Sequence, residues 1–327
     1  AARRPAANNA CMNTAWTPLA AAPAQLGESP FWHPLESRLY WVDIAGRALW
    51  RSGVHGSDAQ CWPLPAEPGC IAPARQGGTP AGLVVALRDR ICHAPRWGGP
   101  LLTLAHLPID PATERANDGK CDALGRLWVG TVHEPAQGPR QPVAALYCID
   151  LRGGDQGGPD APTVRRMLDG VATANGLAWS PDGRTLYWSD TPSHTIRAWD
   201  CNAQLEPIGA PRVLHRFATR DEAVPYGGRP DGAAVDAEGA YWCALYEGAR
   251  VLRLSPRGEV LAELPTPLSC PTMPCVGGPD GHTLFVTSAR KGRSADELAR
   301  WPQSGQVLST RVAVAGLPVA WCEIGQR

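Results

Sequence analysis

The sequence predicts an all-β chain that folds as a six-bladed β-propeller, with four-stranded antiparallel blades around a central metal-containing channel. Two observations predict this fold. A phrase made of a turn and an apolar strand recurs along the chain at about fifty-residue intervals, which is the size of one blade. The 35 Gly and 33 Pro are also spread along all 327 residues, as expected for many short turns between short strands.

Five copies of the phrase have a polar or glycine-containing turn followed by a strand rich in Leu, Tyr, Trp and Val. They span residues 34–43, 123–131, 181–189, 237–244 and 279–287. Asp-Gly turns between apolar segments favour hairpins, because Gly adopts the positive φ that such turns require. A degenerate sixth copy spans residues 83–92. A β-sandwich with coincidental hairpins is the alternative fold, but it would not repeat one phrase at blade spacing.

Further strands are predicted after several of these copies, at residues 145–150, 195–200 and 250–254, where apolar and polar side chains alternate. Residues 294–299 are expected to form at most a short helical turn. We expect one propeller domain over residues 14–327. Residues 1–13 are expected to be a disordered or added leader, with residues 1–11 ahead of a natural start at Met12.

Charge and cysteine content narrow the function classes. The 31 basic and 31 acidic residues balance, so we expect no nucleic-acid or membrane partner, and a small substrate without strong charge. The eleven cysteines form no C-x-x-C pair, which excludes the common zinc-ribbon and redox motifs. Scattered cysteines are typical of a reducing compartment, so we expect free thiols, a cytoplasmic location and a monomer or weak homo-oligomer.

Polar residues interrupt the segment ahead of four of the turns. Glu28, Asn117, Asn175 and Asp231 each lie beside small residues at the same position of the repeat. In a propeller this position is on the innermost strand, so the four side chains are expected to meet around one axis. Taken singly, Asn-Gly and Asp-Gly are ordinary turn dipeptides. The inference depends on their coincidence at one position of a repeat.

Two carboxylates and two amides that converge in a buried channel predict a bound cation, because the like charges repel without one. Oxygen ligands without sulfur or imidazole suit hard divalent ions. We expect Ca²⁺, with Zn²⁺, Mg²⁺, Mn²⁺ and Fe²⁺ as alternatives.

A family resemblance follows from the order of these motifs, which begins near residue 26 and continues to about residue 317. The sequence resembles the family of senescence marker protein, gluconolactonase and luciferin-regenerating enzyme, and the segment 287–298 is more similar to its bacterial pentonolactonase and gluconolactonase members. The motifs that carry the resemblance are Gly27-Glu28-Ser29-Pro30, Arg115-x-Asn117-Asp118-Gly119-Lys120, Asn175-Gly176-Leu177-Ala178, Pro230-Asp231-Gly232 and Gly277-Gly278-x-Asp280.

The resemblance implies a cation held by Glu28, Asn175 and Asp231, with substrate contacts from Arg115 and Asn117. It also implies hydrolysis of a sugar lactone to the aldonic acid. In this hypothesis Asp231 is both a metal ligand and the general base.

One stretch of the sequence departs from the family pattern. Some members carry an acidic pair after the motif that matches Gly130-Thr131, whereas this chain has only Glu134, which we assign to substrate binding. Tyr226 and Arg229 precede Asp231 and are expected to shape specificity. Two other functions stay open: a metal-dependent ester or phosphoester hydrolase on the same scaffold, and a propeller that binds a partner without catalysis.

Overall fold

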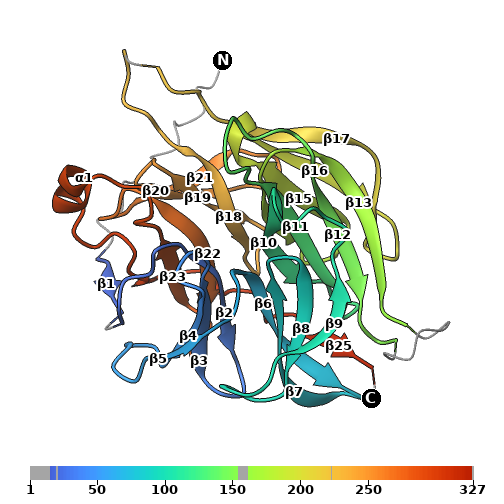
Figure 1. Cartoon of the computed structure of the whole chain (residues 1–327). Helices are drawn as coiled ribbons and strands as arrows, with labels where there is room; N and C mark the ends of the chain where they lie inside the picture. The colour runs from blue at the N-terminus through green and yellow to red at the C-terminus, as the bar shows by residue number, and fades with distance from the viewer. Residues whose placement is uncertain (1–14, 20, 154–160, 222, 326–327) are drawn as a thin grey trace.

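The computed structural model describes residues 15–19, 21–153, 161–221 and 223–325. Six sheets, each with four antiparallel strands and one of them extended by a parallel fifth strand, are arranged around a central axis in the described residues, which confirms the predicted six-bladed propeller (Figure 1). The first strands of neighbouring blades contact one another all the way round, so these strands line the channel. The leader expected at residues 1–13 lies outside the described residues.

The blades follow one another in chain order, and within each of the first five the strands run in sequence from the innermost outward. The first three blades are β2 (Gly27–His33), β3 (Arg38–Asp43), β4 (Ala48–Ser52) and β5 (Gln60–Pro63); β6 (Pro68–Gln76), β7 (Thr79–Leu87), β8 (Arg90–Ala94) and β9 (Leu102–His106); and β10 (Glu114–Cys121), β11 (Leu127–His133), β12 (Ala144–Asp150) and β13 (Thr163–Val171). The next two are β14 (Ala174–Trp179), β15 (Thr185–Asp190), β16 (Thr195–Cys201) and β17 (Pro207–Arg216); and β18 (Arg229–Val235), β19 (Tyr241–Tyr246), β20 (Arg250–Leu254) and β21 (Val260–Pro265).

The sixth blade is built from both ends of the described chain. It contains β22 (Pro271–Gly277), β23 (Thr283–Ser288), β24 (Leu308–Arg311) and, as its outermost strand, β1 (Thr17–Pro18). Thr17 pairs with Ser309, and Trp16 Nε1 donates to the Pro265 carbonyl over 2.7 Å. This pairing closes the ring. At the other end of the chain, β25 (Cys322–Ile324) runs parallel to β6.

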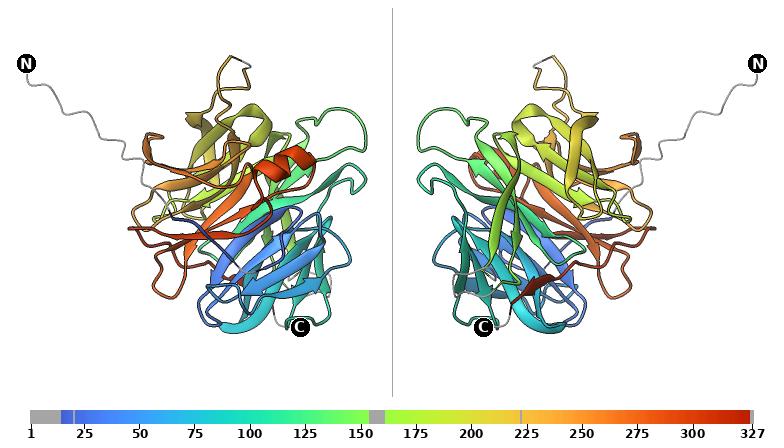
Figure 2. Two further views of the ribbon diagram at one scale, coloured as in Figure 1. Left: turned by 90° about the vertical axis from the view of Figure 1, so that its left-hand side faces the viewer. Right: turned by 90° about the vertical axis from the view of Figure 1, so that its right-hand side faces the viewer.

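The helical content is small, as the sequence predicted. The helix α1 (Ala295–Arg300) begins after Ser294, whose side chain accepts from the Glu297 amide. A single 3₁₀ turn, η1 (Thr191–Ser193), follows β15. Side views show that α1 lies on the same side of the ring as the loop at residues 134–143 and the segment at residues 223–228 (Figure 2). No helix in the described part of the chain is long and apolar enough to cross a membrane.

Five copies of the predicted phrase end in the second strand of a blade: β3, β11, β15, β19 and β23. The sixth copy, residues 83–92, is out of phase. It covers the end of β7, the following turn and the start of β8. The turn that precedes β7 is instead Gly77-Gly78, with φ of 56° and 80°. Because β7 is buried along its second half, its apolar run resembles the phrase although the turn follows it.

The core lies between the blades, and two buried aspartates anchor it in equivalent ways. Trp128 Nε1 donates to Asp122 Oδ2, and Trp242 Nε1 donates to Asp236 Oδ2, both over 2.8 Å. Each aspartate also accepts two backbone amides of the turn before the second strand. A buried charge is stable only when it is paired and hydrogen-bonded. These two residues therefore fix a turn, an indole and a strand at once.

Candidate metal and substrate site

A bulge interrupts every innermost strand at the same height. The register with the second strand shifts at residues 28–31, 68–70, 116–119, 175–178, 230–233 and 271–274. Bulges turn side chains out of the regular alternation, and they are frequent beside active sites. Glu28, Asn117, Asn175 and Asp231 all lie at these bulges or directly beside them. This shared backbone feature is the reason that the four residues occupy one position of the repeat.

Three of these side chains form a continuous hydrogen-bonded chain. Asn117 Nδ2 donates to Asn175 Oδ1 over 2.8 Å, and Asn175 Nδ2 donates to Asp231 Oδ1 over 2.7 Å. Arg115 extends the chain outward, because its Nη1 donates to Asn117 Oδ1 over 2.8 Å and its Nε donates to Glu134 Oε2 over 2.8 Å. The structure thus brings together every predicted site residue of blades three to five. Which of them bind metal or substrate stays a prediction.

Glu28 lies in the same ring but is not part of this chain. It is 7% exposed and follows directly on from the close-packed Gly27. Its neighbour Ser29 has a φ of 48°, and the Ser29 amide donates to Glu28 Oε2 over 3.2 Å. Among the described residues, no side chain donates a hydrogen bond to Glu28. Burial, followed by the charges of Asp231 and Asp118, raises the pKa of Glu28 well above its usual range.

The electrostatics of this ring fit a cation. Burial, followed by the nearby Asp118 charge, raises the pKa of Asp231 to about 8. Asp118 accepts from the Leu177 amide over 2.8 Å through Oδ2, whereas its buried Oδ1 has no hydrogen-bond partner among the described residues. Carboxylates that repel one another in a buried ring are stabilised by positive charge between them. The donor set of Glu28, Asn175 and Asp231 therefore fits a hard divalent ion.

This donor set depends on an amide ligand. Within the described residues, no group of three or more His, Cys, Asp or Glu side chains is placed to hold a metal ion. The expected ligands, two carboxylates and one asparagine oxygen, differ from such a group because one of the three is an amide. They leave coordination positions that water or a substrate oxygen would fill.

Three residues of the ring were missed by sequence reasoning. Thr191 Oγ1 accepts from Asn175 Nδ2 over 2.8 Å and donates to the Pro230 carbonyl, so it orients that amide. Gly69 is the residue of β6 at this height, and a Cβ there would lie 2.6 Å from the Ala116 carbonyl carbon. Thr272 donates to the Gly27 carbonyl. Gly69 and Thr272 could have been identified from the sequence only by their position in the repeat, which is equivalent to that of Glu28, Asn175 and Asp231.

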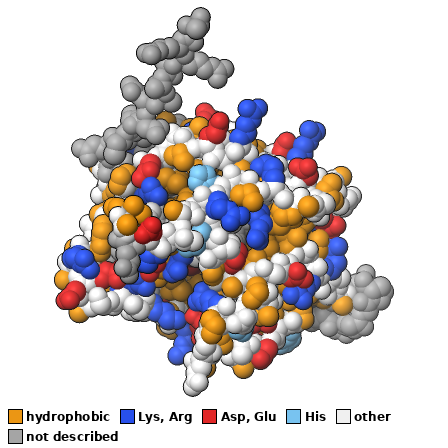
Figure 3. All heavy atoms as spheres, turned by 90° about the horizontal axis from the view of Figure 1, so that it is seen from above, with side chains coloured by type: hydrophobic (Ala, Val, Ile, Leu, Met, Phe, Trp, Pro, Cys, Tyr) orange, Lys and Arg blue, Asp and Glu red, His pale blue; other side chains and the backbone are white. Residues whose placement is uncertain are grey.

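Basic side chains surround the mouth of the site on the side where the inner strands begin. Glu134 lies 2.8 Å from Arg115, 3.7 Å from Arg140 and 3.7 Å from Lys291. Burial alone would raise the pKa of Glu134, but these three cations lower it below its ordinary value. Glu134 is therefore the centre of an ionic cluster as well as a neighbour of Arg115. A view from above shows basic side chains near the middle of this face (Figure 3).

A second ionic cluster is also centred on one glutamate, here with three arginines. Glu247 lies 3.1 Å from Arg220, 3.4 Å from Arg229 and 2.9 Å from Arg293. Tyr226, which the sequence pointed to, contacts the Arg220 guanidinium through its ring at 4.4 Å. Sequence reasoning missed Glu247 because it lies in the turn after β19, far along the chain from Arg220 and Arg293.

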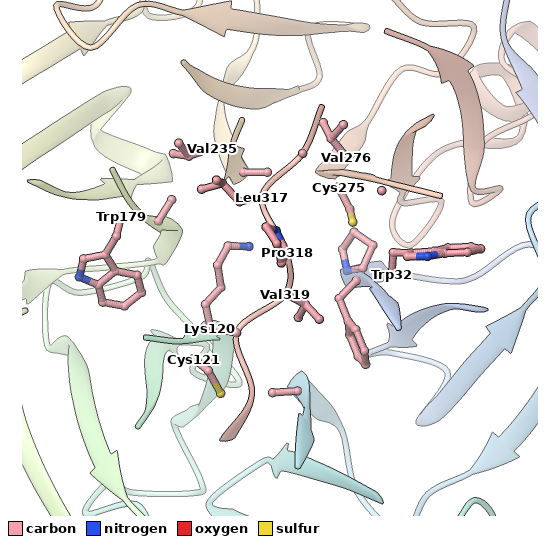
Figure 4. Close-up of a pocket in the computed structure, with 18 of the residues that line it drawn as sticks. Trp32, Lys120, Cys121, Trp179, Val235, Cys275, Val276, Leu317, Pro318 and Val319 are labelled. Carbon is pink, nitrogen blue, oxygen red and sulfur yellow. The ribbon is translucent and has the colours of Figure 1, made fainter. Parts of the chain in front are cut away.

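The opposite end of the channel is apolar. A cavity of about 510 Å³ lies there, where the inner strands end, and the C-terminal segment 317–320 crosses it. Figure 4 shows Trp32, Trp179 and Val235 around this space, with the Lys120 side chain directed into it. Burial raises the pKa of both Glu28 and Asp118, and the charge of Lys120, which approaches the ring from this end, partly offsets the rise. The two ends of the channel therefore have different chemistry.

Fold and site together define a six-bladed propeller with an acidic, amide-bearing ring at one end of its channel. Residues 26–290 match the family described as SMP-30/Gluconolactonase/LRE-like region. The chain belongs to this family.

Two curated relatives are lactonases by name. The chain is 41% identical over 295 residues to the 6-deoxy-6-sulfogluconolactonase of Pseudomonas putida, which covers 90% of this chain and 94% of that protein. It is 33% identical over 295 residues to the L-arabinolactonase of Azospirillum brasilense, covering 90% and 91%. Among solved structures, the calcium-binding protein regucalcin from Agrobacterium tumefaciens is 25% identical, with a TM-score of 0.82 and coverage of 94% of this chain and 97% of that chain.

Proposed function

We propose that this chain hydrolyses a sugar lactone to the aldonic acid with the help of one divalent cation held by Glu28, Asn175 and Asp231. The observation that carries the proposal is the pair of buried carboxylates, Glu28 and Asp231, at equivalent bulges of two inner strands. Relatives at 41% and 33% identity that are named as sugar lactonases support the reaction class. The regucalcin neighbour, described as calcium-binding, supports Ca²⁺ as the first ion to test.

A divalent cation, when bound, supplies Lewis acidity toward a carbonyl oxygen and lowers the pKa of a bound water. The residues of the chain have separate roles around it. Glu28 and Asn175 hold the ion, and Thr191 fixes the orientation of the Asn175 amide. Arg115 and Asn117 lie one step outward and are placed to bind the hydroxyls of the lactone ring. Their mutual hydrogen bond holds each in one rotamer, which reduces the entropy lost on substrate binding.

Asp231 is the residue that we assign to proton transfer. Its Oδ1 accepts from Asn175, whereas no side chain among the described residues donates to its Oδ2. We assign Oδ2 as the atom that accepts a proton from the attacking water. Glu134 acts on the substrate side by holding the Nε of Arg115, while Arg115 Nη1 donates to Asn117.

The test is a panel of five- and six-carbon aldonolactones, measured by release of acid with a pH indicator. The protein is first stripped with a chelator and then restored with Ca²⁺, Zn²⁺, Mg²⁺, Mn²⁺ or Fe²⁺ in separate assays. We expect hydrolysis of at least one lactone that depends on an added ion. Absence of hydrolysis for every lactone with every ion would overturn the proposal. Phenyl acetate and 4-nitrophenyl phosphate serve as the comparison substrates for the two ester-hydrolase alternatives.

A further inference from the structure

The two ionic clusters at the mouth of the site contain more positive than negative charge. Glu134 is shared by three cations and Glu247 by three more, and Glu297 lies 3.5 Å from Arg293 of the second cluster. Six cations therefore face three carboxylates, a surplus of three, in a chain whose 31 basic and 31 acidic residues balance overall. The zero net charge thus conceals a local positive field at this mouth.

Two of these cations lie near Asp231. Arg229 begins β18, two residues before Asp231, and Arg140 lies in the loop that joins β11 to β12. Arg140 Nη1 donates to Thr173 Oγ1 over 2.9 Å, directly before the start of β14. Both charges act on the Asp231 carboxylate. The two guanidinium groups therefore flank the space above Asp231 from the third and fifth blades, on either side of the fourth.

Arg229 has an unused donor. Its Nε is buried and has no hydrogen-bond partner among the described residues. Its Nη2 lies 3.4 Å from Glu247, and its guanidinium carbon lies 5.2 Å from the centre of the Tyr246 ring. A buried guanidinium N–H without a partner costs free energy, which an oxyanion ligand would recover.

We propose that Arg140 and Arg229 form an anion subsite, and that the preferred substrate is a lactone with an oxyanion on the carbon farthest from its carbonyl. Lys291 contributes to the same field from the Glu134 cluster. This inference rests on the proposed function, because the lactone carbonyl must lie at the Glu28–Asp231 ring for its far end to lie at the mouth. Sulfonate and phosphate share the chemistry that the subsite recognises.

The charge arrangement favours an anion over a neutral hydroxyl. Burial lowers the pKa of Arg140, and the like charges of Arg115 and Arg229 lower it further against the opposing charge of Glu134. Like charges held together at one mouth are stabilised by a counter-charge between them. Guanidinium groups also bind two oxygens of a tetrahedral sulfonate or phosphate at once through paired N–H donors, which a single hydroxyl cannot satisfy.

The experiment compares three lactones on the same cation-loaded protein: D-glucono-1,5-lactone, its 6-phosphate, and 6-deoxy-6-sulfogluconolactone. We expect kcat/KM for one or both anionic lactones to exceed that of the neutral lactone by about tenfold or more. The R140M and R229M variants should each lower the ratio of anionic to neutral kcat/KM by about tenfold, because each removes one charged hydrogen-bond donor. The preference should also shrink as ionic strength rises.

R311M is the matched control, since Arg311 is an exposed arginine paired with Asp280 outside both clusters. It should leave the ratio unchanged. A wild-type ratio of one or less, or an unchanged ratio in both R140M and R229M, would overturn the anion subsite. Preference for the sulfonate over the phosphate, or the reverse, identifies which anion the subsite accepts.

Direct binding separates failure of the subsite from failure of the proposed reaction. Glucitol and glucitol 6-phosphate cannot be hydrolysed as lactones, so calorimetry with these two probes tests the subsite without catalysis. Binding of the phosphate about tenfold tighter, and its loss in R229M, supports the subsite even if no lactone is hydrolysed. Equal affinity for the two probes rejects it.

Discussion

Asn175 donates to the Asp231 carboxylate over 2.7 Å and accepts from Asn117 over 2.8 Å, so a single amide joins the expected metal ligands to the expected substrate residues. The amide can do both only while its orientation is fixed, and Thr191 fixes it from η1, directly after β15. A substitution of Asn175 should therefore affect both cation binding and substrate binding.

The first prediction concerns this amide. Asn175→Ala should weaken cation affinity by about tenfold or more and also raise KM for the lactone, because it removes one ligand and the support of Asn117. Calorimetry with Ca²⁺ and steady-state kinetics at saturating Ca²⁺ check the two effects. Thr191→Val, which keeps the shape but removes the hydroxyl, should show a smaller loss of the same kind. Normal affinity in Asn175→Ala would exclude this residue as a ligand.

The second prediction concerns Glu28. Glu28→Gln keeps the size of the side chain but removes its charge, so cation affinity should fall by at least about tenfold. The rise in melting temperature that wild-type protein gains from added cation should be lost in parallel. Glu263→Gln is the control, since Glu263 is an exposed residue paired with Arg250. If the propeller binds a partner without catalysis, Glu28→Gln would leave its function intact.

The third prediction separates two roles of Asp231. Asp231→Asn should reduce kcat by about a hundredfold or more when the cation is saturating, because the residue no longer accepts a proton from water. Occupancy must be measured on the same sample by elemental analysis. Full occupancy with near-normal kcat would show that Asp231 only holds the ion.

The fourth prediction concerns stability away from the site. Asp122 accepts the Trp128 indole, the Arg126 guanidinium and two backbone amides while almost fully buried. Asp122→Ala should lower the free energy of unfolding by about 3–5 kcal/mol, because it leaves these donors unpaired. Asp182→Ala, at an exposed turn of another blade, should change it by less than about 1 kcal/mol. Chemical denaturation monitored by tryptophan fluorescence measures both.

Much of the fold could be predicted from the sequence because its signals are local. Each turn and second strand is encoded within about ten residues, so five copies of the phrase were placed correctly. The copy at 83–92 was wrong in phase. The turn that precedes β7 is Gly77-Gly78, and the buried apolar residues of β7 do not follow it directly. The pairing of β1 with β24 could not be predicted from local signals, since Thr17 and Ser309 lie near opposite ends of the sequence.

The site was predicted in part for the same reason. Glu28, Asn117, Asn175 and Asp231 share a position of the repeat, which a single sequence contains. The bulges that direct them inward arise from pairing between strands, and no local motif specifies them. The partners of Glu134 and Glu247 depend on loops from different blades that meet only in the folded ring. The expectation of a weakly charged substrate came from net charge, which takes no account of where the charges lie.

Because β1 closes the sixth blade against β24, the ring stays open on the ribosome until residues near 311 have left the exit tunnel. Glu28 is in the first blade, and three further blades are synthesised before Asp231, in the fifth, leaves the tunnel. A nascent chain therefore lacks the full set of proposed cation ligands until its fifth blade is made. An ion that binds at this stage would stabilise only chains in which the first, fourth and fifth blades have already packed together.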